Sequence, residues 1–153
     1  MNPYALEHIF SYRGTLASPP EAIGEMAEGI RVNFYSTGGE ITGPKIRGRL
    51  KPVGGDWMTV RKDGTALMDV RTTFETEDDA LILVTYQGIA DLGEDGYEHF
   101  LKGELPATVR LRISPRFVTN HSKYAWLNRL HCLGIGEYRA ATNDALYDVY
   151  AVR

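Results

Sequence analysis

The sequence predicts an all-β fold, a single closed antiparallel β-barrel of about nine strands with one short helix. Short segments in which apolar and polar residues alternate recur along the 153-residue chain, as expected of half-buried strands. Turn-forming residues, among them many of the 16 glycines and 7 prolines, separate these segments. Strands do not alternate with amphipathic helical segments of about ten to fifteen residues, so a parallel sheet is not indicated.

Hairpin-like connections order the strands along the chain. Lys62-Asp63-Gly64 and Thr142-Asn143-Asp144 have the composition of tight hairpins, Thr37-Gly38-Gly39 supplies positive φ, and Glu77-Asp78-Asp79 is a polar reversal. Consecutive strands are therefore expected to run antiparallel. The predicted strands are Leu6 to Arg13, Gly29 to Ser36, Glu40 to Lys51, Trp57 to Arg61, Thr65 to Glu75, Ala80 to Ile89, Thr108 to Ser114, Leu130 to Ala140 and Ala145 to Val152.

Many short strands must either close as a barrel or pack as a sandwich, because open edges invite aggregation. We expect closure, and the sandwich is the alternative. The one helical segment is predicted over Ser122 to Arg129, and Leu92 to His99 is predicted to be a polar loop that rims a ligand site.

The segment Ala80 to Val84 is apolar on both faces, which is typical of a strand covered on both sides. Either Pro115 to Arg129 or a second copy of the chain would cover its outer face. We expect a homodimer.

Composition favours one domain over residues 1–153 and sets the class of partner. Hydrophobic residues make up 43% of the chain and charged residues 24%, an ordinary globular composition, and no apolar run approaches the roughly 18 residues of a membrane helix. The first residues carry no targeting pattern, which predicts a cytoplasmic location and no membrane partner. A net charge of −3 argues against nucleic acid as a partner.

Basic residues alternate in the stretch Lys45 to Lys51. On a strand they would share one face, which favours a solvated outer surface and leaves an anion site as the alternative.

The strand Thr65 to Glu75 carries the most informative polar face. Asp69 and Arg71 share this face, and period-two alternation does not say whether it points to water or to the barrel lumen. In a lumen, the arginine could anchor a carboxylate, phenolate or enolate, and the aspartate could relay protons. Outside, the two side chains would form a weak surface ion pair.

Two further segments are candidate site residues. Two glycines allow a sharp turn before Asp56 and Trp57, which would place an acid and a stacking surface at a strand mouth. Trp126 and Asn128 on the predicted helix could bind ligand if that helix caps the barrel. Turn hydrogen bonding and core packing are the alternative roles of these four residues.

No cofactor is expected. The four histidines and the single Cys132 lack the short spacings of a zinc site, and a buried, inert thiol is the ordinary role for that cysteine. Phosphate-binding loops and the nucleophile elbow are missing from the sequence, so metal and nucleotide cofactors are not indicated.

Several segments together resemble the family called domain of unknown function three-two-three-seven. The matching pieces, spread from about Leu6 to Val152, are Gly38 to Pro44, Gly54-Gly55-Asp56-Trp57, Arg61 to Gly64, Asp69-Val70-Arg71 and Tyr124 to Asn128. The resemblance implies a calycin-like barrel similar to allene oxide cyclase, without a recognised cofactor and with largely unassigned activity. It also implies a role for Arg31 in Gly29-Ile30-Arg31, clustered with the Asp56 turn and the Asp69 strand at one barrel mouth. On this resemblance we predict that the face with Asp69 and Arg71 looks into the lumen.

Three functions compete at this point. The first is a cofactor-independent isomerase, cyclase or lyase in which Asp69 or Asp56 moves a proton and Arg71 and Arg31 hold negative charge. The second is a lipocalin-like carrier of a small apolar or aromatic metabolite, anionic if an arginine anchors it. The third is an interaction module whose barrel is filled by side chains. Finding both Asp69 and Arg71 on the outer barrel surface, in open water, would reject the first.

Overall fold

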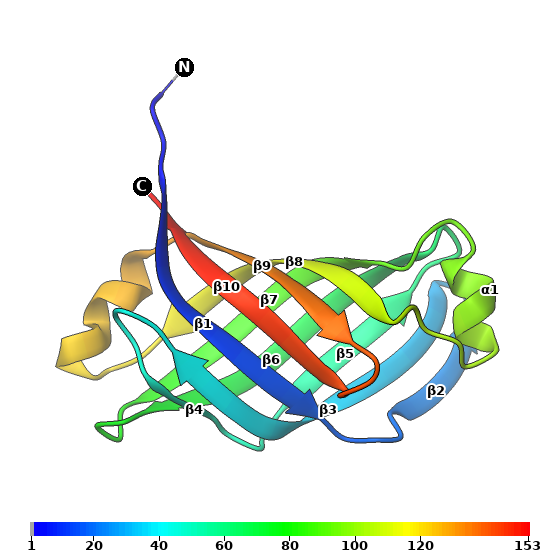
Figure 1. The fold of residues 1–153 in the computed structure, drawn as a ribbon, viewed down its shortest axis with the longest axis horizontal. Helices are drawn as coiled ribbons and strands as arrows, with labels where there is room; N and C mark the ends of the chain where they lie inside the picture. Colours follow the sequence, from blue (N-terminus) through cyan, green and yellow to red (C-terminus); the bar gives the residue numbers. More distant parts are fainter. Residues whose placement is uncertain (1) are drawn as a thin grey trace.

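The computed structural model describes residues 2–153 and shows a closed antiparallel β-barrel (Figure 1), which confirms the predicted fold class. Eight strands form the ring, and two shorter strands, β2 and β4, are added to it. The strands are β1 (Leu6–Leu16), β2 (Glu21–Met26), β3 (Gly29–Thr42), β4 (Gly48–Leu50), β5 (Gly55–Val60), β6 (Thr65–Thr76), β7 (Leu81–Asp91), β8 (Thr108–Val118), β9 (Cys132–Arg139) and β10 (Asp144–Val152).

Antiparallel pairing runs from β1 through β10, β9, β8, β7 and β6 to β5 and β4, and both of these pair with β3. The ring closes where Ser11–Leu16 of β1 pairs with Ser36–Thr42 of β3. Closure leaves the ring without an open edge, which is the advantage that favoured a barrel over a sandwich.

The long strand β3 joins the predicted strand Gly29 to Ser36 to the first residues of the predicted strand Glu40 to Lys51, whose last residues form the separate strand β4. The residues of β3 continue through Gly38 and Gly39, where the sequence predicted a turn. Gly38 has a φ of 120°, and a Cβ on Gly39 would lie 2.0 Å from the carbonyl oxygen of Arg13 on β1. These glycines therefore bend the strand and admit β1 closely, rather than reversing the chain.

Short helices lie at the two ends of the barrel (Figure 1). The 3₁₀ helix η1 (Ser122–Arg129) confirms the predicted helical segment, and α1 (Gly96–Leu101) lies partly within the predicted loop Leu92 to His99. No helix among residues 2–153 is long and apolar enough to cross a bilayer.

The interior is packed with side chains at the end near η1. The rings of Phe10, Phe74 and Phe117 contact one another with centroids 5.5 to 6.3 Å apart, and Leu127 of η1 is almost fully buried. Aromatic edge-to-face contacts of this kind add to the free energy of burial. The other half of the barrel interior is hollow.

The outer surface confirms the solvated interpretation of the basic stretch. Lys45 pairs with Glu7, Arg49 with Glu75, and Arg47 with Glu77.

Three apolar residues on the outer face of β7 and β8 are exposed: Leu81 by 52%, Leu83 by 48% and Val118 by 56%. Coverage of this face by Pro115 to Arg129, the alternative to the expected homodimer, is therefore contradicted, and the homodimer stays a prediction.

Candidate functional site

The hollow half of the barrel contains a cavity with a volume of about 100 Å³. Its wall comes from all eight ring strands and from Leu50 of β4, and Leu92, Phe100 and Leu105 between β7 and β8 close one side. The strand residues that line it are mainly apolar or aromatic, including Phe34, Met58, Met68, Val70, Val109 and Leu111. A mostly apolar cavity with a few polar groups is the usual form of a small-molecule site.

Asp56 enters this cavity because of the glycine turn that precedes it. Gly54 has a φ of 78°, and a Cβ there would lie 2.0 Å from the carbonyl oxygen of Arg71. Gly55 likewise leaves no room for a side chain against the carbonyl oxygen of Phe34, 2.3 Å from a Cβ position. Two glycines thus let β5 start tightly between β3 and β6, with Asp56 pointing inward.

Asp56 is only 9% exposed. Its Oδ1 accepts a hydrogen bond of 2.9 Å from the backbone N–H of Asp69, and no second hydrogen bond to the carboxyl group is found among the described residues. The β5–β6 ladder is interrupted at Trp57 and Met58, beside this contact. One carboxyl oxygen is therefore fixed, and the other is available to a ligand.

Burial raises the pKa of Asp56 from its ordinary value of 3.8 to about 7. The negative charge of Asp69 acts in the same direction, whereas the hydrogen bond from the Asp69 backbone and the charge of Arg31 oppose the rise. A carboxyl group with this pKa can accept and return a proton near neutral pH.

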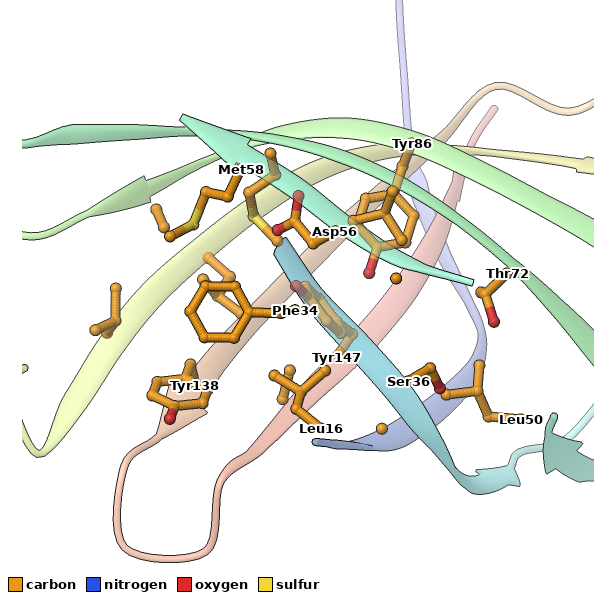
Figure 2. A pocket seen from close by; sticks show the side chains of 18 of the residues that line it. Leu16, Phe34, Ser36, Leu50, Asp56, Met58, Thr72, Tyr86, Tyr138 and Tyr147 are labelled. Carbon is orange, nitrogen blue, oxygen red and sulfur yellow. The ribbon is translucent and has the colours of Figure 1, made fainter. Parts of the chain in front are cut away.

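Three tyrosines provide the other polar groups of the cavity. Tyr12 from β1 stacks on Tyr147 from β10 with ring centroids 4.9 Å apart, and Tyr86 from β7 meets Tyr147 edge-on at 6.0 Å. Figure 2 shows Asp56 beside Tyr86, with Phe34 and Tyr147 facing them across the cavity. Burial raises the pKa of all three tyrosines far above the ordinary value of 10.0, so each phenol stays protonated.

Two glycines of β9 leave space for inward side chains, Gly136 for Tyr147 and Gly134 for Ile113. A Cβ on Gly136 would lie 2.5 Å from Cδ1 of Tyr147, and one on Gly134 would lie 2.4 Å from Cγ1 of Ile113. The Gly134-Ile135-Gly136 sequence, which does not complete a nucleotide-binding motif, therefore lets the Tyr147 ring lie close to the barrel wall.

The remaining hydroxyl groups of the cavity are used by the protein itself. Thr72 Oγ1 donates to the carbonyl oxygen of Val53 at 3.0 Å, Ser36 Oγ donates to that of Lys51 at 3.4 Å, and the Tyr138 hydroxyl donates to Asn143 Oδ1 at 2.9 Å. Asp56, Tyr12, Tyr86 and Tyr147 are left to recognise a ligand.

The prediction that Asp69 and Arg71 face the lumen is wrong, and this outcome rejects the enzyme hypothesis in the form that relied on them. The cavity is lined by their neighbours Met68, Val70 and Thr72, so the alternation places both side chains on the outer face. They lie 3.5 Å apart as an ion pair, with side chains 42% and 59% exposed. Their contact with the site is indirect, through the Asp69 backbone N–H.

Arg31 and Trp57 also lie on the outer face, whereas Asp56, which was expected at a strand mouth, points into the cavity. Arg31 Nη1 donates to Thr59 Oγ1 at 2.9 Å. The guanidinium carbon of Arg71 lies 6.0 Å from the Trp57 ring. The residues expected at one barrel mouth are thus near one another across β3, β5 and β6, but all except Asp56 are outside.

Trp126 and Asn128 lie on η1, at the barrel end opposite α1 and away from the cavity (Figure 1). Asn128 Oδ1 accepts from the backbone N–H of Thr119 at 2.9 Å, and its Nδ2 donates to the carbonyl oxygen of Thr119 at 2.8 Å. Trp126 is half-buried, with the Lys45 ammonium 5.6 Å from its ring. Both residues contribute to the packed end of the barrel.

The three tyrosines were missed because they lie on strands far apart in sequence. Each stands on the apolar face of its own strand, next but one to Phe10, Val84 and Val149. This alternation marks them as inward, but no local motif joins them.

Within residues 2–153, no group of three or more His, Cys, Asp or Glu side chains is arranged to hold a metal ion. Burial raises the pKa of Cys132 to about 11.

The chain is similar to known proteins whose functions are largely unknown. A family model described as "Protein of unknown function (DUF3237)" matches residues 4–152. A UPF0311 protein of Rhodopseudomonas palustris is 28% identical over 148 residues, covering 95% of each chain. A UPF0311 protein of Bradyrhizobium diazoefficiens is 34% identical over 106 residues, covering 68% of this chain and 69% of its own.

Solved structures share the whole fold. A beta-barrel like protein from Acinetobacter baumannii AYE has a TM-score of 0.85 and 28% identity, covering 100% of this chain and 98% of its own. A structure described as an enzyme from Penicillium herquei has a TM-score of 0.70 and 25% identity, covering 100% of this chain and 97% of its own.

Proposed function

The chain belongs to the DUF3237 family of proteins of unknown function, and we propose that it binds a small apolar or aromatic molecule in the barrel cavity and catalyses a proton transfer on it. The supporting observation is Asp56, a buried carboxyl group with a pKa of about 7 in an otherwise mainly apolar cavity. Neither packing nor an ion pair accounts for a carboxyl group at this position, since burying one costs free energy. Such groups are concentrated at functional sites.

The reaction class that suits this site is a cofactor-independent isomerisation, cyclisation or elimination. The Asp56 carboxylate takes a proton from a carbon or hydroxyl group of the ligand, and the electron pair moves into a neighbouring bond or onto an oxygen atom. The same carboxylic acid returns the proton to another atom or to solvent. The similar structure described as an enzyme from Penicillium herquei supports a catalytic role.

The alternative is a calycin-like carrier that binds the same kind of molecule without changing it. The mainly apolar lining, in which Asp56 is the one carboxyl group, favours this alternative. A carrier needs only the cavity, so a test must separate binding from proton transfer.

The compound 5-nitrobenzisoxazole makes this test possible without knowledge of the natural substrate. A carboxylate removes its ring C–H proton, the electron pair forms a nitrile as the N–O bond breaks, and a coloured nitrophenolate results. We expect the wild-type protein to accelerate this elimination, with a rate that rises through about pH 7 as Asp56 ionises. Asp56→Asn should lower the rate at pH 8 by about 100-fold, the lower range for a general base.

The matched control is Asp69→Asn, which removes a carboxyl group on the outer face and retains the backbone N–H that contacts Asp56. This variant should keep the wild-type rate at pH 8. Equal rates for wild type and Asp56→Asn would reject catalysis by Asp56. Binding of the compound without any acceleration would favour the carrier.

The cellular setting of this activity also stays a proposal. The apolar outer residues Leu81, Leu83 and Val118 support a homodimer, and the single buried Cys132 suits a cytoplasmic protein.

A further inference from the structure

Two buried hydroxyl groups in the cavity lack a hydrogen-bond partner. No donor or acceptor among the described residues meets hydrogen-bond geometry with the hydroxyl groups of Tyr12 or Tyr147, although both tyrosines line the cavity. The residues are 6% and 3% exposed. Unpartnered buried hydroxyl groups are unfavourable in a native protein, so their retention here points to a bound group that satisfies them.

The third tyrosine brings its hydroxyl group to the same place. Burial is the main cause of the raised pKa of Tyr12 and Tyr147, and the nearby Tyr86 hydroxyl group adds to it, although its contacts with them fall short of hydrogen-bond geometry. The Asp56 charge also acts on the pKa of Tyr86 and Tyr147. The three tyrosines come from β1, β7 and β10, whereas Asp56 comes from β5. A ligand in the cavity would therefore have a proton acceptor on one side and several O–H donors on another.

We propose that Tyr12, Tyr86 and Tyr147 together bind one oxygen atom of the ligand, and that this oxygen carries negative charge during the reaction. The ligand class is then a phenol or an enolisable ketone. This inference rests on the proposed function, because it assigns the atom that receives the electron pair when Asp56 removes a proton.

The chemistry of the site suits an oxyanion of this kind. Removing a proton beside a carbonyl group, or from a phenol, leaves an enolate or phenolate oxygen, and hydrogen bonds to an ionised oxygen are stronger than those to a neutral one. The tyrosines remain donors because burial keeps their pKa values high. Protonated Asp56 and the oxyanion then carry one negative charge between them, which avoids two charges in an apolar cavity.

Binding of 4-nitrophenolate tests the donor set separately from catalysis. The measurements use Asp56→Asn protein at pH 8, where the charge of the aspartate no longer opposes the phenolate, and follow the absorbance of the bound phenolate. Adding Tyr12→Phe or Tyr147→Phe should weaken binding by about 10-fold each, the loss of one hydrogen bond to a charged group.

Tyr138→Phe is the matched control, since this tyrosine lines the same cavity but donates to Asn143. It should leave the phenolate affinity unchanged. Tyr12→Phe and Tyr147→Phe should also raise the Tm, because each removes an unpartnered buried hydroxyl group. A purely structural role would give the opposite, a lower Tm.

Unchanged phenolate affinity in both tyrosine variants would overturn the inference while leaving the elimination test of Asp56 intact. If a variant fails to fold, the Asp56→Asn protein alone decides through a comparison with 4-nitroanisole, which cannot ionise. Donor hydroxyl groups require the phenolate to bind at least 10-fold more tightly than the ether, and equal affinities would reject them.

Discussion

One hydrogen bond joins Asp56 and Asp69, from the backbone N–H of Asp69 to Asp56 Oδ1, yet their two carboxyl groups lie in different surroundings. Asp56 is buried in the cavity, and Asp69 is on the outer face. The difference arises because successive side chains of a strand point to opposite faces. Asp56 occupies an inward position of β5, and Asp69 occupies an outward position of β6. Chemistry at this site is therefore determined by burial rather than by residue type.

Burial of Asp56 makes the stability of the protein depend on pH in a defined direction. The folded protein binds this proton more tightly than the unfolded chain, because the pKa is about 7 when folded and 3.8 in the ordinary state. The free energy of unfolding should thus fall, by roughly 1.4 kcal/mol per pH unit, as the pH rises from about 4 to about 7, and this loss should persist above pH 7. Asp56→Asn removes this contribution.

Urea unfolding of both proteins between pH 5 and pH 8 measures the effect. The stability of Asp56→Asn minus that of wild type should increase up to about pH 7 and then level off. The groups that influence Asp56 are Asp69 and Arg31 on the outer face and Tyr86 and Tyr147 in the cavity. Asp69→Asn should retain most of the pH dependence. A difference that is constant with pH would show that Asp56 titrates normally.

At the scale of elements, the alternation of apolar and polar residues shows which residues of a strand share a face, but not which face is buried. The alternation in Thr65 to Glu75 correctly predicted a strand and correctly put Asp69 and Arg71 on one face, without showing whether that face points inward or outward. Burial of Met68, Val70 and Thr72 decides it, because a barrel of this size fills or lines its interior with mainly apolar side chains.

The neighbours Ile82 and Leu83 on β7 test the orientation of that strand. Ile82 is fully buried and Leu83 is 48% exposed. Ile82→Ala should lower the free energy of unfolding by about 2 to 5 kcal/mol, whereas Leu83→Ala should change it by less than about 0.5 kcal/mol. Urea unfolding of the two variants provides the comparison.

The same pair bears on the expected homodimer. If a second copy covers β7, the cost of Leu83→Ala should grow with protein concentration, and sedimentation velocity should show a smaller species for this variant. Equal, concentration-independent costs for Ile82→Ala and Leu83→Ala would contradict the assigned faces.

Elements that the sequence did not predict have particular physical reasons. The strand β2 is mostly exposed and pairs only with β3, so its residues carry no burial pattern. The turn predicted at Thr37-Gly38-Gly39 failed because a glycine also serves for a bend and for close strand approach. Tyr12, Tyr86 and Tyr147 meet only through strand order, which a single sequence does not contain.

For the whole molecule, the main feature is a barrel with one solid half and one hollow half. Aromatic rings such as Phe10 and Phe74 fill the end near η1, and the cavity occupies the end near α1. The solid half stabilises the closed sheet and lets the other half keep buried polar groups that cost stability. This division explains how Asp56 and two unpartnered hydroxyl groups are tolerated in one small protein.

Enlarging one valine in each half tests this division directly. Val70 lines the cavity, whereas Val84 is fully buried in the packed half. Val84→Phe should lower the free energy of unfolding by about 1 to 3 kcal/mol through overpacking. Val70→Phe should cost little, because its ring enters empty space, but should abolish binding of 4-nitrophenol. Thermal unfolding and titration with 4-nitrophenol of both variants provide the measurement. Equal destabilisation of the two variants would mean that the cavity is not open. A closed cavity could not hold a ligand between Asp56 and the tyrosines.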